Sequence, residues 1–275
     1  PVARRGRSIA IVTSAFTISS VFGIPLALEL AVMFDWKMPF IAIAIFALIV
    51  AVGIFITLPS MTNHIDMSSD APKKIPLMSL LKRSEIRLSY ILVSLQSFAQ
   101  FMLFAGSINY FIFNLGYPRD GLSMIYIIGG ALSFAAMMLT GRIIDFYGNR
   151  LLSIIVTIVY VIVLYDGYLH QPIMSVPFIF SSFILCAAIM GVIASTISSE
   201  APGDHERAAY MSLQSTCRHL AAGAGGLISS IILTTNCDGS LNNIEILALA
   251  AIICLVSLPF IIVILRKILN KKYLA

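Results

Sequence analysis

Long apolar runs separated by short polar connections dominate the chain. Each run is about 20 residues long and almost free of charge, which is the length that a helix needs to cross a bilayer core. Strands of a membrane barrel are shorter and alternate polar with apolar positions, whereas these runs are continuous. The pattern therefore predicts an all-α, polytopic transmembrane helix bundle. We expect about eight spans, at residues 8–33, 38–58, 88–113, 121–140, 151–168, 173–198, 208–235 and 246–265.

Composition places these runs in lipid. Of the 275 residues, 59% are hydrophobic and only 11% are charged, and the mean hydropathy is +0.96. Soluble proteins carry about 25% charged residues. This chain has too few charged side chains to cover the surface of a water-soluble protein of its size. The net charge of +5 does not indicate nucleic acid, because the basic residues lie between apolar runs and form no patch with aromatic residues. The four cysteines are too scattered for a metal site, and we expect neither a metal nor a cofactor.

The distribution of Lys and Arg predicts the orientation in the membrane. With eight spans, both ends of the chain lie on one side. Fifteen of the 18 Lys and Arg residues lie in the ends and connections of that side, Lys37 and Arg119 lie in the opposite connections, and Arg218 lies within a span. The positive-inside rule places the basic side in the cytoplasm. We expect a multi-pass protein of a bacterial inner membrane, with both termini of this chain cytoplasmic.

A polar linker divides the spans unequally. Residues 59–87 form the longest connection and contain Pro59, Pro72 and the pair Lys73 and Lys74. This division predicts two transmembrane helices in residues 1–58, a cytoplasmic linker in residues 59–87 and a six-helix bundle in residues 88–275. Residues 77–87 suit either a short amphipathic helix in the membrane interface or a solvated connector with a basic end.

The connection between the fourth and fifth expected spans carries a recognisable motif. Residues 141–150 read G-R-I-I-D-F-Y-G-N-R. Gly141 and Gly148 permit a sharp turn, and Arg142, Asp145 and Arg150 can pair with charges or face a helix end. Alone, the pattern is compatible with an ordinary tight turn. It also resembles the G-x-x-x-D-x-x-G-x-[RK] loop motif of the major facilitator superfamily.

Two further segments strengthen this resemblance. The first span contains Gly23 and Pro25 and is followed by D-W-K-M-P-F at residues 35–40, which looks like the fifth helix and following loop of drug/proton antiporters. Residues 200–213 are similar to the turn into the eleventh helix. The eight spans would then correspond to helices five to twelve of a twelve-helix transporter, so that residues 1–58 are the remainder of its N-terminal bundle.

The resemblance implies a secondary active transporter rather than an enzyme. We expect proton-coupled efflux, by an antiporter, of small amphiphilic solutes or sugars. Because helices one to four have no counterpart and the sequence begins at Pro1 rather than Met, we expect a fragment, a truncated gene product or an engineered piece of a longer protein. The alternative function is therefore a transport-incompetent remnant. The expected partners are a small-molecule substrate, protons, membrane lipid and the missing N-terminal helices, but not nucleic acid.

The resemblance also implies a conformational lock built from the loop motif. Its members are Gly141, Arg142, Asp145, Gly148, Arg150 and Glu200. Asp145 is expected against the start of the first span at residues 8–10, where the helix dipole favours a carboxylate. Arg142 or Arg150 is expected to approach Glu200. The pair Gly23 and Pro25 is expected to kink the first span, because proline removes a helical hydrogen bond.

Polar residues within the spans mark a candidate substrate cavity. Gln96 and Gln100 lie four residues apart on one helical face, and Asn109 lies farther along. They could line a cavity or simply hydrogen-bond to other helices. Arg218 lies about 15 Å into the seventh span, near the expected midplane. It could face a cavity, or it could snorkel towards the interface at a degenerate position. No residue is expected to be catalytic.

Overall fold

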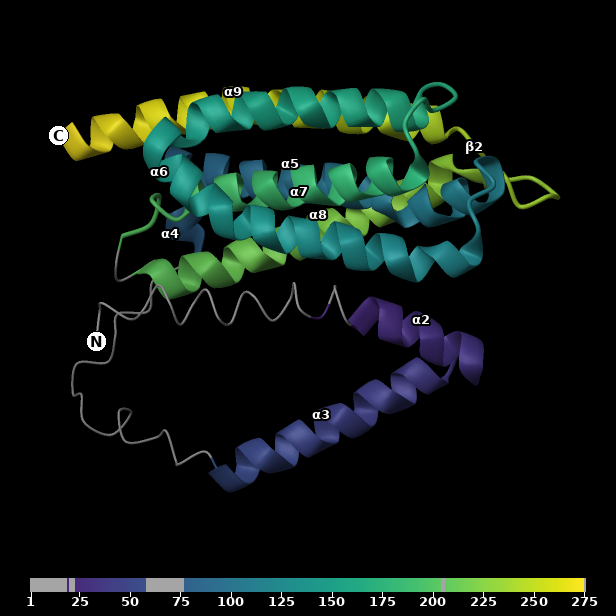
Figure 1. Ribbon diagram of the computed structural model, residues 1–275. Coiled ribbons are helices and arrows are strands. Elements are labelled where there is room, and N and C mark those ends of the chain that lie inside the picture. The colour runs from purple at the N-terminus through teal and green to yellow at the C-terminus, as the bar shows by residue number, and fades with distance from the viewer. Residues whose placement is uncertain (1–18, 20–22, 58–76, 204–205, 275) are drawn as a thin grey trace.

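A computed structural model describes residues 19, 23–57, 77–203 and 206–274 (Figure 1). Nearly all of these residues are helical, which confirms the all-α prediction. A π-helical turn, η3 (Tyr110–Asn114), and a 3-10 turn, η4 (Arg119–Gly121), follow α5. The α-helices are α2 (Ile24–Met33), α3 (Met38–Thr57), α4 (Leu77–Lys82), α5 (Ser84–Asn109), α6 (Leu122–Tyr168), α7 (Val176–Ser198), α8 (Arg207–Ile232) and α9 (Ile244–Leu274).

Six helical segments of the described chain are long and apolar enough to cross a membrane. They are Met38–Thr57, Ser84–Asn114, Arg119–Ile144, Gly148–Tyr168, Val176–Ser198 and Ile244–Lys271. They confirm six of the eight expected spans. Only part of the first expected span lies among the described residues, as the ten-residue α2. The seventh is present as α8, whose 26 residues reach about 39 Å, but Gln214, Arg218 and His219 make it too polar to count as a span by composition.

The long helix α6 contains a sharp turn at Gly148. Its backbone there has φ 76° and ψ 158°, a conformation open to glycine but strained for residues with a Cβ. The turn divides α6 into two membrane-length segments, which run to the end of the bundle near α4 and back again (Figure 1). The second glycine of the loop motif is therefore required by the backbone. Gly141 is helical and has open space where a side chain would project.

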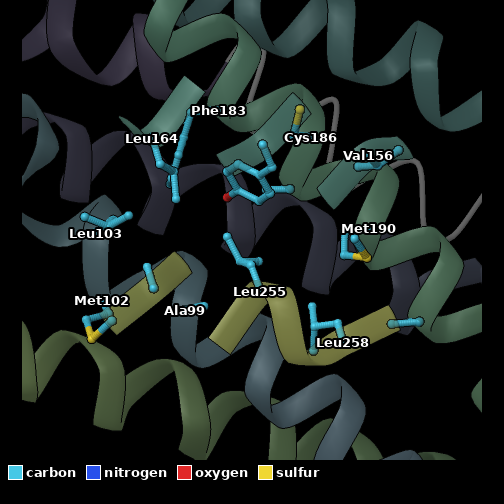
Figure 2. Close-up of a cluster of buried hydrophobic side chains, with 14 of the residues drawn as sticks. Ala99, Met102, Leu103, Val156, Leu164, Phe183, Cys186, Met190, Leu255 and Leu258 are labelled. Carbon is cyan, nitrogen blue, oxygen red and sulfur yellow. The ribbon is translucent and has the colours of Figure 1, made fainter. Parts of the chain in front are cut away.

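Six helical segments form a compact bundle. Helix α5 packs against α8 and α9, and α6 packs against α7. Figure 2 shows the core where α5, the second half of α6, α7 and α9 meet. Side chains there include Met102, Leu164, Phe183 and Leu255, all buried. Because lipid is as apolar as these side chains, close packing rather than hydrophobic burial holds the helices together.

Helices α2 and α3 lie beside this bundle (Figure 1). Helix α2 contacts α6 and α3. Helix α3 exposes apolar side chains on all sides, including Phe40, Phe46 and Phe55. A helix that is apolar all round is compatible with lipid rather than with water. The division of the chain at residues 58 and 87 stays a prediction.

The basic connections gather at one end of the bundle. Helix α4, the turn within α6 and the C-terminal end of α9 lie there, while the α2–α3 turn and a small hairpin lie at the opposite end (Figure 1). The hairpin pairs β1 (Thr234–Thr235) with β2 (Leu241–Asn242) in antiparallel fashion. The apolar pattern gave no sign of it, because two-residue strands carry no usable periodicity.

Residues 77–87 do not form one amphipathic helix. Helix α4 ends at Lys82, Arg83 is extended (φ −82°, ψ 128°), and α5 begins at Ser84. Leu80 is fully buried, so α4 is fastened to the bundle by its apolar side. A short helix is therefore present, as one of the two expectations had it, but it ends at Lys82 rather than at Arg87; its place in the membrane interface stays a prediction.

Candidate functional site: a polar seam between α5, α7 and α8

Two of the expected cavity residues meet on α5. Gln96 Nε2 donates to Gln100 Oε1 over 3.1 Å and also lies 3.4 Å from the backbone oxygen of Ala187 on α7. Gln96 is buried and Gln100 half-buried. Asn109 is exposed and lies about 20 Å farther along the helix from Gln96. The structure thus joins the two glutamines to α7 and leaves Asn109 apart from them.

Arg218 of α8 contacts the same helix, α7. Its Nη2 donates to Ser195 Oγ of α7 over 2.9 Å, and the residue is half-buried. Ala187, Gly191 and Ser195 are spaced by four and therefore share one face of α7. A Cβ at Gly191 would lie 3.8 Å from Gln96 Nε2. We call Gln96, Gln100, Gly191, Ser195 and Arg218 the polar seam.

A buried hydroxyl network adjoins the polar seam on α8. Tyr210 donates its hydroxyl to Ser89 Oγ over 2.8 Å and accepts from Gln214 Nε2 over 3.0 Å. Ser89 in turn donates to the backbone oxygen of Ile86. The ring of Tyr90 stacks on Tyr210 with 5.0 Å between centroids. Polar groups in lipid need such partners, so the network fixes α5 against α8 at this level.

Sequence reasoning missed this network, although a signal was present. Tyr210, Gln214 and Arg218 recur every four residues, which places one polar stripe along α8. Such a stripe in an otherwise apolar helix indicates an interface with other polar groups. Arg218 by itself does not reveal the stripe, which becomes visible only together with Tyr210 and Gln214.

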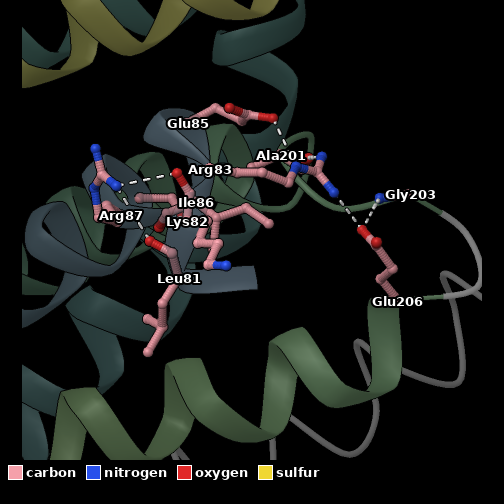
Figure 3. A network of polar contacts seen from close by, with 10 residues as sticks. Leu81, Lys82, Arg83, Glu85, Ile86, Arg87, Ala201, Gly203 and Glu206 are labelled. Atoms are coloured by element: carbon pink, nitrogen blue, oxygen red, sulfur yellow. Dashed lines mark hydrogen bonds and ion pairs between the residues drawn. The ribbon is translucent and has the colours of Figure 1, made fainter. Parts of the chain in front are cut away.

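A second polar cluster fastens α4 to the bundle (Figure 3). Arg83 donates to Glu85 Oε1 over 2.9 Å, to Glu206 Oε2 over 2.5 Å and to the backbone oxygen of Ala201 over 3.3 Å. Burial lowers the pKa of Arg83, but the hydrogen bonds and charges of Glu85 and Glu206 outweigh it and raise the pKa overall. Arg87 donates to the last carbonyls of α4, those of Leu81 and Lys82. The cluster ties α4 and the starts of α5 and α8 together.

The loop motif is only partly described. The side chain of Asp145 and residues 8–10 lie outside the described residues, so their expected contact stays a prediction. Arg142 and Arg150 are exposed. The expected approach of either one to Glu200 is wrong: Glu200 Oε2 instead accepts from Arg266 Nη1 of α9 over 2.6 Å. Arg266 lies eight residues before the end of α9, at the level where Glu200 follows α7.

Gly23 and Pro25 lie at the described start of α2. Gly23 is the N-cap with helical dihedral angles (φ −70°, ψ −42°), and Pro25 is buried in the first turn. Proline is tolerated there because backbone N–H groups in the first turn of a helix have no intrahelical acceptor, so the N–H that proline lacks is not missed. Residues 20–22 are outside the described part, so the expected kink remains a prediction. Within the described residues no group of three His, Cys, Asp or Glu side chains could hold a metal ion.

The family described as Major Facilitator Superfamily matches residues 1–226. A chloramphenicol resistance protein of Streptomyces lividans is 26% identical over 145 residues, which are 53% of this chain and 37% of that protein. An uncharacterized MFS-type transporter, YbcL, of Bacillus subtilis (strain 168) is 38% identical over 78 residues, 28% of this chain and 18% of that protein.

The match thus covers well under half of the length of either relative. No solved structure matches this chain. The family match nevertheless extends over most of the chain and agrees with its membrane-length helices. The chain belongs to the major facilitator superfamily.

Proposed function

We propose that the protein containing this chain is a secondary active transporter that exports small amphiphilic solutes or sugars in exchange for protons. The family match over residues 1–226 carries this proposal. Similarity to a chloramphenicol resistance protein supports export of an amphiphilic solute. In such transporters two helix bundles rock around a site near the bilayer midplane. We propose transport without chemical change of the solute, and we assign no catalytic residue.

The polar seam is the proposed solute site. It offers two amides, a hydroxyl and a guanidinium along α5, α7 and α8, at buried or half-buried positions; Ser195 lies in the last turn of α7. Ionisable and amide groups are costly within a membrane and are retained where they meet water or a polar ligand. Asn109 is too far from these groups to share the same site, and we place it at a mouth of the cavity.

Orientation and location form the second part of the proposal. The basic end of the bundle faces the cytoplasm of a bacterial cell, and both termini of this chain lie there, as the positive-inside rule favours. The loop motif around Asp145 acts as a lock between the two bundles at that face. Two ion pairs at the same end of the bundle, Arg83 with Glu206 and Arg266 with Glu200, keep the six-helix bundle rigid while it rocks.

Transport into everted membrane vesicles tests the proposal. Vesicles containing the protein are given an inside-acid pH gradient, and uptake is measured for anionic, neutral and cationic amphiphiles, with chloramphenicol as a neutral member. Uptake of at least one solute that stops when a protonophore is added is the expected result. Vesicles lacking the protein are the control. Uptake that is equal with and without the protein for every solute would reject the proposal.

A further inference from the structure

Arg218 carries a positive charge within the bundle, and none of the ion pairs among the described residues includes it. The guanidinium stays protonated at all relevant pH values. Its hydrogen bond goes to a hydroxyl, that of Ser195, which carries no charge. A half-buried charge without a counterion is costly in a membrane. The residue therefore needs water or an anion from outside the described chain.

The acids of the neighbouring helices are engaged elsewhere. Among the described residues, α7 and α8 contain no Asp or Glu, and the one acid of α5 is Glu85, which accepts from Arg83. Glu206, just before α8, also pairs with Arg83. Glu200, just beyond α7, pairs with Arg266. Glu85 lies at the start of α5, Glu206 lies twelve residues before Arg218, and Glu200 lies five residues beyond Ser195, where α7 has ended.

The other groups near Arg218 are neutral dipoles. Ser195, Gln96 and Gln100 offer hydroxyl and amide groups, and Gln214, one turn away, donates to Tyr210. Dipoles orient a bound group but do not cancel a unit charge. The polar seam is therefore a net positive site, and only one nitrogen of the fork, Nη2, is engaged by Ser195.

We propose that the polar seam selects solutes that carry an anionic group, such as a carboxylate or a sulfonate. A guanidinium binds such groups through two parallel hydrogen bonds, and the desolvated surroundings strengthen them. The apolar part of the solute would extend along α5 and α7. This inference rests on the proposed function, because it assigns the substrate class of the same site.

Charge-selective thiol labelling measures this property without a known substrate. The four native cysteines are replaced by serine or alanine, and Gly191→Cys places a thiol in the polar seam, where the added Cβ would be in ordinary contact with Gln96. Its reaction rates with a negatively charged sulfonatoethyl and a positively charged trimethylammonioethyl methanethiosulfonate are each divided by the rate with a free thiol in solution. The expected ratio favours the anionic reagent several-fold, because a nearby unit charge attracts one reagent and repels the other.

Variants assign the preference to Arg218. Arg218→Gln in the same background should remove the several-fold preference, and Arg218→Lys should retain most of it. Lys267→Gln, which removes an exposed charge from α9, should leave it unchanged. Three results would each overturn the inference. They are a rate ratio near one in the Gly191→Cys protein with Arg218 present, a preference for the anionic reagent that survives Arg218→Gln, and no reaction with either reagent. Labelling does not depend on transport, so vesicle uptake of neutral solutes alone would overturn this inference and leave the proposed function standing.

Discussion

The Tyr210 hydroxyl satisfies two buried polar side chains at once. It donates to Ser89 and accepts from Gln214, and all three residues have little access to solvent. Without the hydroxyl, the Gln214 amide would lose its acceptor, and Ser89 would keep only its bond to the backbone oxygen of Ile86. The Tyr210 hydroxyl therefore stabilises the packing of α5 against α8 through two hydrogen bonds.

We therefore expect Tyr210→Phe to destabilise the bundle by about 1–3 kcal/mol, the usual cost of leaving buried polar groups without partners. The free energy of unfolding in mixed detergent micelles measures this effect. Tyr165→Phe is the matched control, since Tyr165 is exposed on α6. Equal stability of the two variants would mean that the network does not hold α5 to α8.

A glycine allows α8 to approach the backbone of α5. A Cβ at Gly225 of α8 would lie 2.6 Å from the carbonyl oxygen of Phe98 on α5, and backbone atoms cannot yield as a flexible side chain can. We expect Gly225→Ala to force the helices apart and to cost about 1–3 kcal/mol of unfolding free energy. Gly223→Ala should be neutral or stabilise the helix by up to about 1 kcal/mol, because no atom lies within 4 Å of that added carbon. A larger loss for the Gly223 variant would contradict the packing described here.

Helix α4 is attached to the bundle chiefly by Leu80 and Arg83. Arg83→Gln should loosen it, because the amide cannot keep the contacts with Glu85, Glu206 and Ala201 together. The ion pairs are partly exposed, so the global stability should fall by no more than about 1 kcal/mol. Faster hydrogen exchange of α4 amides, with α9 unchanged, is the expected observation. Arg150→Gln, at an exposed position, serves as the control, and equal α4 exchange in both variants would refute the attachment.

Hydrophobic runs predicted where the helices lie but not which faces meet. The span at residues 173–198, for example, corresponds closely to α7, Val176–Ser198. The length of an apolar run indicates a helix that crosses lipid, and this property depends only on residues close together in the sequence. The pairing of Glu200 with Arg266, the Tyr210 network and the contact of Gln96 with α7 depend on how distant helices pack. The stripe along α8 was visible in the sequence, but its partners on α5 and α7 were not.

At the scale of the whole molecule, the two ends of the bundle differ in charge. Native Cys237 is exposed at the hairpin end, opposite α4. In a background that keeps Cys237 alone, an impermeant thiol reagent should react from outside intact cells. With Cys237 replaced and Lys82→Cys introduced, reaction should require permeabilised cells, because the positive-inside rule places that end in the cytoplasm. The opposite pattern would reverse the topology.

Transport through the polar seam is the central claim, and one measurement tests it most directly. The initial rate of proton-driven solute uptake into everted vesicles is compared for the unaltered protein and for Gly191→Phe, which puts a ring into the space beside Gln96. Gly53→Phe, at an open position on α3, is the matched control. Loss of uptake in the Gly191 variant, at equal amounts of membrane-inserted protein and with the Gly53 variant active, is the result predicted here. Full uptake by the Gly191 variant would place the solute path elsewhere and contradict the account.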